Sequence, residues 1–515
     1  MGLWDGLKPN EIGDAPSAPD SYTNNQWQAQ SALYREMWEY FNRDIFDTTL
    51  SAQSNIKKYP LGINIFEQAC TIHRAALVGE FKDDVLQFRV TSPNSKNKDA
   101  AMVEQKIDQI WVESGRNSIL LEGGLVCQIL GGVVFRVLWN PARKKAYIRL
   151  LQPDAWFPVW DPDDYHQINE CYVSYMIDAA SAKHKYNVRL DDDKDVPVPV
   201  WEHWDRDFYE VRVDGKLAYW DRAHQFPMGG ENIYRDPQTN VGVIPFEYFP
   251  RDRAGSFYGI PLGKNLLQLQ NEYNLRAADL GDGAMEAAHQ YMFAKNIPAG
   301  TDSIRLQRGK LINLGVGALG GKDPDVIAVK GGEVPEASVN WVQRLQGDTR
   351  SAAYTPDVAY GEDEGSQRSA LTLAFRMWPM TQSVRAVRGF WTDSFYHLNR
   401  KAIIVASSYE KNGYGLESRH ADYRLIPMWA PMLPKDRSEE VNEVVVRKQT
   451  GLISTYHAVE LLEDREKDYI EEEVARIEAD RQQEADLMMQ QAMAQGQGGN
   501  PAKTNITPPR SVPDS

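Results

Sequence analysis

A long helical stretch, broken once by a proline and an acidic loop, constrains this chain more than any other feature. Residues 335–354 carry apolar side chains on roughly one helical face. Pro356 must end that helix, because proline disfavours α geometry in the residue before it and has no N–H to donate. Residues 357–369 are rich in glycine and carboxylates, and residues 370–409 return to a helical period with a kink expected at Pro379. We therefore predict two helices that present an exposed loop; an ordinary surface loop between two core helices is the alternative.

The composition is that of a soluble protein with several folded modules. Its 515 residues exceed the usual length of one domain, and 42% apolar and 25% charged residues are ordinary for a globular chain. The net charge of −15 disfavours a tight grip on nucleic acid, although DNA could still slide past an acidic wall. Three separated cysteines predict no disulfide framework, and no secretory signal or membrane-spanning stretch is visible. We expect a reduced, intracellular protein without a membrane partner.

The first half of the chain predicts an α+β body after an N-terminal arm, residues 1–25. Helices are expected at about 26–46, 63–81 and 99–130, and mostly short strands from there to residue 250. Asp214-Gly215 indicates a hairpin, because both turn positions favour positive φ. The many Trp and Tyr residues indicate a packed core rather than a cofactor site.

A second long helix is predicted at residues 262–293, where leucine, alanine and tyrosine form a narrow apolar seam. Gly281 and Gly283 each weaken it by about 1 kcal/mol, so packing must hold it. Residues 296–334 leave the helical period and predict two or three short strands with glycine turns. The helix at 335–354 should then return antiparallel, as a stalk with the strand unit at its far end.

Three helices are predicted in residues 435–495, the first closed by Gly451 and the second capped by Ser454. Residues 496–515 are disordered by composition.

No motif predicts catalysis, a metal or a cofactor. Residues 315–320 fit G-x-G-x-x-G, but no helix follows to bind a pyrophosphate. Residues 259–265 have three residues between the glycines of a would-be P-loop and an asparagine in place of the magnesium-binding hydroxyl. Acidic residues at 191–195 have calcium-loop offsets but valine at the position that needs glycine. The histidines show no zinc spacing.

The order of these parts resembles the portal protein of tailed bacteriophages, of the siphophage type. Three segments carry the resemblance: residues 151–164 in the body, residues 359–371 in the acidic loop, and residues 433–462 near the end. The last is the most specific, because it has a Gly-Leu-Ile-Ser start of a short helix after an acidic helix.

The resemblance implies a ring, usually of twelve subunits, at one capsid vertex. Such a ring is the channel for packaging and ejection of double-stranded DNA, the docking site for terminase and neck adaptor, and the nucleator of procapsid assembly. It divides the chain into an arm (1–25), wing (26–257), stem helices (258–294 and 335–354), clip (295–334), tunnel loop (355–366), long kinked helix with return to the wing (367–434), helical crown (435–495) and tail (496–515).

The partners implied are double-stranded DNA in the channel, terminase, scaffold, major capsid protein and neck adaptor. The location implied is the virion, and the host cytoplasm during assembly. The candidate tunnel-loop residues are Thr355, Pro356, Asp357, Tyr360, Gly361, Glu362, Asp363, Glu364, Gly365 and Ser366. The candidate clip residues, for docking or DNA contact, are Lys295, Arg305, Arg308, Lys310 and Lys322.

Two other functions stay open on the sequence alone. One is a packaging enzyme, a terminase-like ATPase or nuclease, against which the missing P-loop speaks. The other is a generic structural or scaffolding ring. The acidic tip of the loop also argues against a strong grip on phosphate.

Overall fold

The structure is a computed structural model. It describes residues 25–42, 63–79, 86–91, 98–140, 143–190, 196–221, 226–288, 290–295, 311–313, 325–330, 334–362, 370–409, 413–430, 432, 437–462 and 467–496. Two compact units make up the chain, residues 1–433 and residues 434–515. The first unit mixes helices and strands, as the predicted α+β body requires, and the described part of the second is helical.

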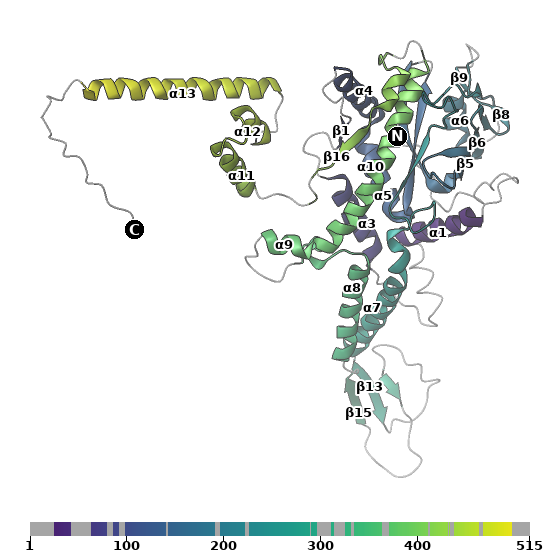
Figure 1. Ribbon diagram of the computed structural model, residues 1–515. Coiled ribbons are helices and arrows are strands. Elements are labelled where there is room, and N and C mark those ends of the chain that lie inside the picture. Colours follow the sequence, from purple (N-terminus) through teal and green to yellow (C-terminus); the bar gives the residue numbers. More distant parts are fainter. Residues whose placement is uncertain are drawn as a thin grey trace, which may run out of the picture. The chain divides into compact units, whose positions relative to one another are not determined.

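A three-stranded antiparallel sheet with helices packed on it forms the main core of the first unit (Figure 1). The strands, in spatial order, are β12 (Phe246–Pro250), β2 (Gly132–Asn140) and β3 (Lys145–Leu151). The helices packed on it are α4 (Lys98–Ser114), α5 (Arg116–Leu130) and α10 (Trp378–Ser407). Strands β2 and β3 pair with each other as an antiparallel hairpin.

Aromatic side chains fill the space between α10 and this sheet. Phe249 on β12 lies edge-on to Phe135 on β2 at 4.8 Å and to Phe395 on α10 at 4.9 Å between ring centroids. Trp111 on α4 and Trp391 on α10 complete the cluster, and both are almost fully buried. The aromatic residues therefore form a packed core, as predicted.

A second, six-stranded antiparallel sheet follows along the chain. Its order is β11 (Gly229–Glu231), β7 (Phe208–Val213), β6 (Val198–Trp204), β5 (Ile168–Ile177) and β4 (Trp156–Trp160), with β8 (Lys216–Leu217) also paired to β7. The predicted turn between β7 and β8 is confirmed, with Asp214 at φ 51° and Gly215 at φ 74°. Helix α6 (Ala179–Tyr186), which the sequence analysis missed, lies between β5 and β6 and is capped by the Asp178 side chain.

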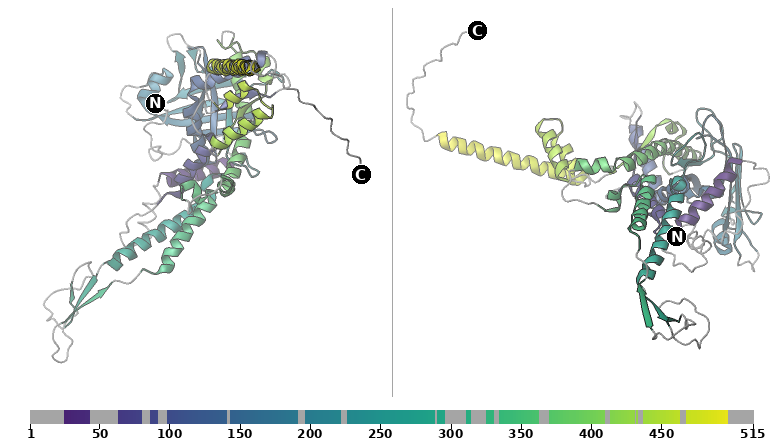
Figure 2. Two further views of the ribbon diagram at one scale, coloured as in Figure 1. Left: turned by 90° about the vertical axis from the view of Figure 1, so that its left-hand side faces the viewer. Right: turned by 90° about the horizontal axis from the view of Figure 1, so that it is seen from below.

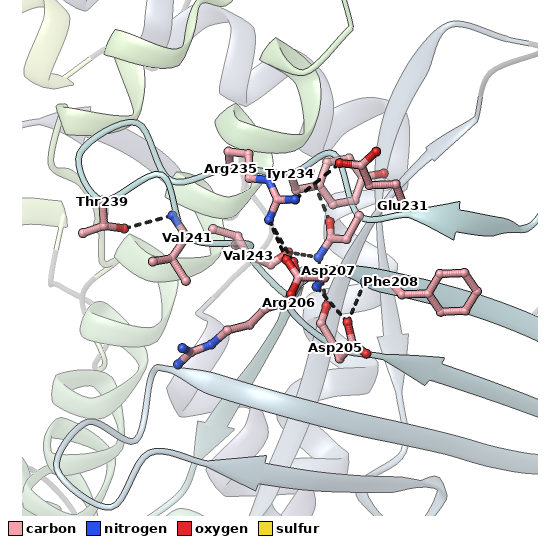
Figure 3. A network of polar contacts seen from close by, with 11 residues as sticks. Asp205, Arg206, Asp207, Phe208, Glu231, Tyr234, Arg235, Thr239, Val241 and Val243 are labelled. Carbon is pink, nitrogen blue, oxygen red and sulfur yellow. Dashed lines mark hydrogen bonds and ion pairs between the residues drawn. The ribbon is translucent and has the colours of Figure 1, made fainter.

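A polar network pins the chain after β11 onto the turn between β6 and β7 (Figure 3). The Asn232 amide donates to the main-chain oxygens of Asp205, at 3.0 Å, and Val243, at 3.2 Å. The Arg235 guanidinium donates to the Arg206 oxygen and pairs with Asp207. The network therefore fixes the path of the chain after β11, where regular helices and strands are lacking.

The helices of the body differ from the prediction at their ends. The expected helix at 99–130 is two helices, because Gly115 at φ 84° turns the chain between α4 and α5. Helix α3 (Ile65–Val78) ends before residue 81, at Gly79 with φ 91°. Helix α1 (Asn25–Phe41) ends before residue 46. Glycine accepts a positive φ at little cost, which explains why α4 stops at Gly115 and α3 at Gly79.

The predicted stalk is present as two helices side by side, α7 (Leu267–Ala288) and α8 (Glu336–Ala352), in both views (Figures 1 and 2). Tyr273 on α7 and Leu345 on α8 pack with Ile65 of α3, where the stalk meets the body. The first helix is shorter than predicted, because residues 262–265 form a 3₁₀ turn and residues 290–295 form a strand. β-Sheet pairing at this end outweighs the helical seam that the sequence continues to residue 291.

A three-stranded sheet joins the two stalk helices at their far end, as predicted. Strand β13 (Gln290–Lys295) pairs antiparallel with β15 (Asp325–Lys330) and parallel with β14 (Leu311–Asn313). Gly315 to Gly320, the G-x-G-x-x-G match, lies outside the described residues.

The long helix predicted after the acidic loop is broken, not merely kinked. Helix α9 (Ala370–Arg376) stops at Met377, and α10 begins at Trp378 with Pro379 in its first turn. Pro379 has no N–H to donate to the helix before it, so the break falls where the sequence placed the kink. After α10, β16 (Leu425–Met428) returns to pair with β1 (Gln87–Val90), about 340 residues earlier in the chain.

The second unit contains the three predicted helices, α11 (Arg437–Gln449), α12 (Thr455–Leu462) and α13 (Lys467–Gly496). Gly451 at φ 74° follows the first, and the Ser454 hydroxyl accepts from the His457 N–H at the start of the second. Both end signals are therefore confirmed.

Candidate functional site

The candidate site is the root of the loop that follows α8, here defined as residues 353–362. Helix α8 ends when the Thr355 N–H reaches back to the Arg350 oxygen at 3.0 Å, with Tyr354 at φ 55° between them. A 3₁₀ turn, η4 (Asp357–Tyr360), follows Pro356, and Gly361 at φ 79° reverses the chain. Helix α8 ends at Ala352, ahead of Pro356 as predicted, and the loop root is a hydrogen-bonded turn whose acidic side chains face solvent.

Arg350, in the last turn of α8, holds this root together. Its guanidinium donates to Asp357 at 2.9 Å and to both carboxylate oxygens of Glu362, at 2.6 and 2.9 Å. The ring of Tyr360 lies against the same guanidinium, 4.2 Å from centroid to Cζ. One cation therefore joins the start of the 3₁₀ turn, its end and Glu362, two residues beyond that end.

The charges of this cluster support one another. Hydrogen bonding to Glu362 raises the pKa of Arg350 further above its ordinary value, and the same contact lowers the pKa of the Glu362 carboxyl. Burial raises the pKa of Tyr360 to about 12. The Arg350 side chain is only 9% exposed, whereas Asp357 and Glu362 are 63% and 60% exposed. The cation is thus covered by its own partners, and the carboxylates face solvent.

The body holds the other side of the root through His73 of α3. Its Nε2 lies 3.0 Å from the Ala353 oxygen, and both residues are fully buried. Burial and the nearby Arg251 cation lower the pKa of His73 to about 3, so the ring is neutral. Arg251 in turn donates to the Gln128 amide oxygen at 3.0 Å and to the Ser383 hydroxyl of α10 at 3.3 Å. The end of α8 is therefore fixed to α3, and α10 is linked to the same buried cluster.

The structure brings together six of the predicted tunnel-loop residues. Thr355, Pro356, Asp357, Tyr360, Gly361 and Glu362 all lie in the root. Asp363, Glu364, Gly365 and Ser366 lie outside the described residues. Two residues that organise the root, Arg350 and His73, were missed by the sequence analysis. Arg350 carried a weak signal in the sequence, because two carboxylates, Asp357 and Glu362, follow it by seven and twelve residues beyond the predicted helix end. His73 carried none.

Of the five predicted clip residues, the structure describes only the main chain of Lys295. Lys295 ends β13, paired in register with Asp325, and its side chain lies outside the described part. Arg305, Arg308, Lys310 and Lys322 lie outside the described residues altogether.

The described residues contain neither a candidate metal site nor a helix that could span a membrane. None of their His, Cys, Asp and Glu side chains form a group of three or more that could hold a metal ion. Among the helices described, none is long and apolar enough to cross a membrane.

The described residues form an α+β body, a helix pair ending in a small sheet, a loop root held by Arg350 and a helical terminal unit. The sequence profile of the phage portal proteins, SPP1 Gp6-like, matches residues 24–487, nearly the whole chain. The chain belongs to this phage portal protein family. A comparison with curated proteins found no match.

The function of the chain is accordingly that of a phage portal protein, in DNA packaging and as head–tail connector. Portal proteins are structural channel proteins that form ring-shaped oligomers at a capsid vertex and interact with the capsid and the terminase.

Proposed function

We propose that this chain forms a closed ring of about twelve copies, by the cyclic symmetry usual in homo-oligomers, through which duplex DNA enters the head and leaves it. The observation that carries the ring is the set of large apolar side chains that a single copy leaves exposed. Trp341 on α8 is 46% exposed, and Phe375 on α9 and Trp378 on α10 are 69% and 54% exposed. Aromatic side chains exposed along adjoining elements mark interaction surfaces.

We assign the regions of the ring as follows. The body before residue 258 is the wing, α7 and α8 with their flanks (258–294 and 335–354) are the stem, and the β13–β15 unit (295–334) is the clip. Residues 355–366 are the tunnel loop, residues 367–434 include α9, α10 and the return to the wing, and the helices at 435–495 are the crown. Support comes from the order of elements and from the small sheet between two adjacent helices.

The partners follow from these assignments. The clip docks the terminase during packaging and the neck adaptor afterwards, and its cations Lys295, Arg305, Arg308, Lys310 and Lys322 contact those partners or DNA. Scaffold and major capsid protein meet the ring during assembly in the host cytoplasm. The overall charge of −15 suits a wall past which a polyanion slides. We assign no catalytic residue and no cofactor.

The test is the mass and shape of the purified protein, by native mass spectrometry and negative-stain microscopy. We expect rings of about a dozen copies with a hole of roughly 20 Å or more, wide enough for a duplex whose major groove alone is ~12 Å wide. A stable monomer or dimer that hydrolyses ATP would support a packaging enzyme instead.

A second experiment tests the tunnel loop itself. Deletion of residues 361–365 should leave ring assembly intact and abolish DNA packaging. Deletion of residues 506–510 in the C-terminal tail is a control of equal length and should leave both intact. Normal packaging by the loop deletion would favour a generic structural ring.

A further inference from the structure

We propose that Arg350 is the positioning residue of the tunnel loop: its guanidinium clamps residues 357–362 onto the end of α8 and so sets where each copy's loop leaves the stem. The inference rests on the proposed role of this loop. The clamp itself is defined by contacts within one chain.

The first argument is that the chain needs an external hold at this point. Tyr354 leaves α8 in the left-handed region, at φ 55°. A residue with a side chain pays about 1–2 kcal/mol for that conformation. The other non-glycine residues described at positive φ are Lys144, Asn187, Asp214 and Asn240, and Asn and Asp tolerate it better. Contacts beyond the turn must therefore hold the chain in this direction.

The second argument is the convergence of three contacts on one side chain. Asp357 lies at the start of the 3₁₀ turn and Glu362 just beyond its end, and Arg350 pairs with both. Tyr360 covers the face of the same guanidinium. The Glu362 N–H also donates to the Asp357 oxygen at 3.2 Å, which closes the turn on itself. Loss of Arg350 would remove all of these side-chain contacts. The root would keep its main-chain bonds, the Thr355 hydroxyl bond to the Ala353 oxygen and the packing of Val358 against the core.

The third argument is geometry. Isolated ion pairs on a protein surface contribute little to stability, because solvent screens the charges and both side chains lose conformational freedom. Arg350 differs, since it is only 9% exposed and binds Glu362 through both carboxylate oxygens. A bidentate arginine–carboxylate pair fixes orientation as well as distance. The pair therefore sets the direction of the loop.

The same helix offers a matched control. Arg344 is six residues earlier on α8 and pairs with Asp348 at 3.6 Å, with the two side chains 72% and 53% exposed. Substitution of either arginine by glutamine removes one positive charge from α8, but only R350Q should affect the loop root.

The test is hydrogen–deuterium exchange of the amides of Gly361 and Glu362, measured by mass spectrometry on R350Q, E362Q, the double variant R350Q/E362Q and the R344Q control. We expect R350Q to speed exchange by about tenfold or more, corresponding to the loss of a charge-assisted hydrogen bond. E362Q should speed it less, the double variant no more than R350Q, and R344Q should match the unsubstituted protein. Equal exchange in R350Q and R344Q, or additive effects in the double variant, would overturn the clamp.

DNA packaging by the same variants separates the clamp from the proposed function. R350Q rings of normal mass that package less DNA than R344Q rings would support the positioning role. Faster exchange with normal packaging would overturn that role and leave the ring intact. If the unsubstituted protein formed no ring, the proposed function would fail while the exchange result still tested the clamp. Should R350Q not fold, E362Q alters a side chain that is 60% exposed and still decides the question.

Discussion

His73 donates a hydrogen bond from Nε2 to the main-chain oxygen of Ala353 at 3.0 Å, and so joins α3 to the residue that follows α8. A carbonyl oxygen only accepts, so the neutral ring must carry its proton on Nε2. The contact is buried on both sides. It makes the position of the loop root depend on a residue 280 positions earlier in the chain.

The substitution H73L should destabilise the body by about 1–3 kcal/mol, because it leaves the Ala353 oxygen buried without that donor. The unfolding midpoint measured by calorimetry checks this. The substitution H184L on the exposed side of α6 is the control and should shift the midpoint little. Equal shifts in the two variants would mean that the His73 contact contributes nothing specific.

Two histidines with strongly lowered pKa values, the buried His73 and the partly buried His397, predict a loss of stability in mild acid. Burial lowers the pKa of His73 to about 3 and that of His397 to about 4. In the unfolded chain both bind a proton below about 6.5, so the unfolded state gains protons that the folded state refuses. Their contribution is complete above pH 6.5 and is lost as the pH falls towards 4 and 3, by up to about 1.4 kcal/mol per pH unit for each histidine.

Between pH 6.5 and 4.5 the loss of stability due to the histidines can be measured without a contribution from Glu247. Burial alone would raise the pKa of Glu247, but Lys401 and His166 bring it to about 2, so its contribution is lost only below about 4.5. We expect the unfolding midpoint to fall between pH 6.5 and 4.5, with a shallower slope in H73L. An identical slope in H73L would contradict the assignment to His73.

Alanine substitutions at Gly115 and Gly131 distinguish the cost of a positive φ from the cost of a steric clash. Gly131 has φ 81°, and an added Cβ would lie 2.6 Å from the Gly259 oxygen and from the Pro261 nitrogen. Gly115 has a similar φ of 84°, but nothing lies within 4 Å of its added Cβ. G115A should therefore cost about 1–2 kcal/mol, the cost of the left-handed conformation alone. G131A should cost several kcal/mol or prevent folding, because main-chain atoms cannot move aside. Soluble yield and denaturation midpoints measure both, and similar values would disprove the close approach.

Arg388 of α10 ties two distant segments together. It donates to the Leu77 and Ala76 oxygens at the end of α3, at 3.2 and 2.8 Å, and to the Ala430 oxygen at 2.6 Å. Burial lowers its pKa to about 10, still high enough to keep it charged at neutral pH. R388M should cost about 3–5 kcal/mol, because three carbonyl groups lose a charged donor.

Limited proteolysis and the unfolding midpoint check the Arg388 prediction. Cleavage near residue 430 should become faster in R388M, since that segment loses its hold on α10. R385M removes an exposed arginine of the same helix and is the control. Unchanged cleavage in R388M would show that β16 alone retains the segment.

Local chemistry explains which elements could be predicted. Pro356 bars α8 from continuing past its end at Ala352, Asp214-Gly215 makes the hairpin turn, and Gly451 follows the end of α11. Each of these residues limits its own φ or hydrogen bonding whatever surrounds it. The helix ends that were predicted wrongly depend on contacts with segments far away in the sequence. The seam pattern continues to residue 291, yet residues 290–295 pair with β15, since sheet partners satisfy the backbone there. The pattern at 99–130 shows no break, although Gly115 turns the chain where two helices pack.

The amino-acid sequence by itself determined the order of parts, the position of the loop after α8 and the acidic character of the chain, because periodicity, proline and charge act over a few residues. Only the tertiary structure decided what holds the loop root. Arg350 meets Glu362 because Gly361 reverses the chain, and His73 meets Ala353 because α3 packs against the end of α8. Contacts between residues far apart in sequence depend on how whole elements pack, and no local pattern encodes that.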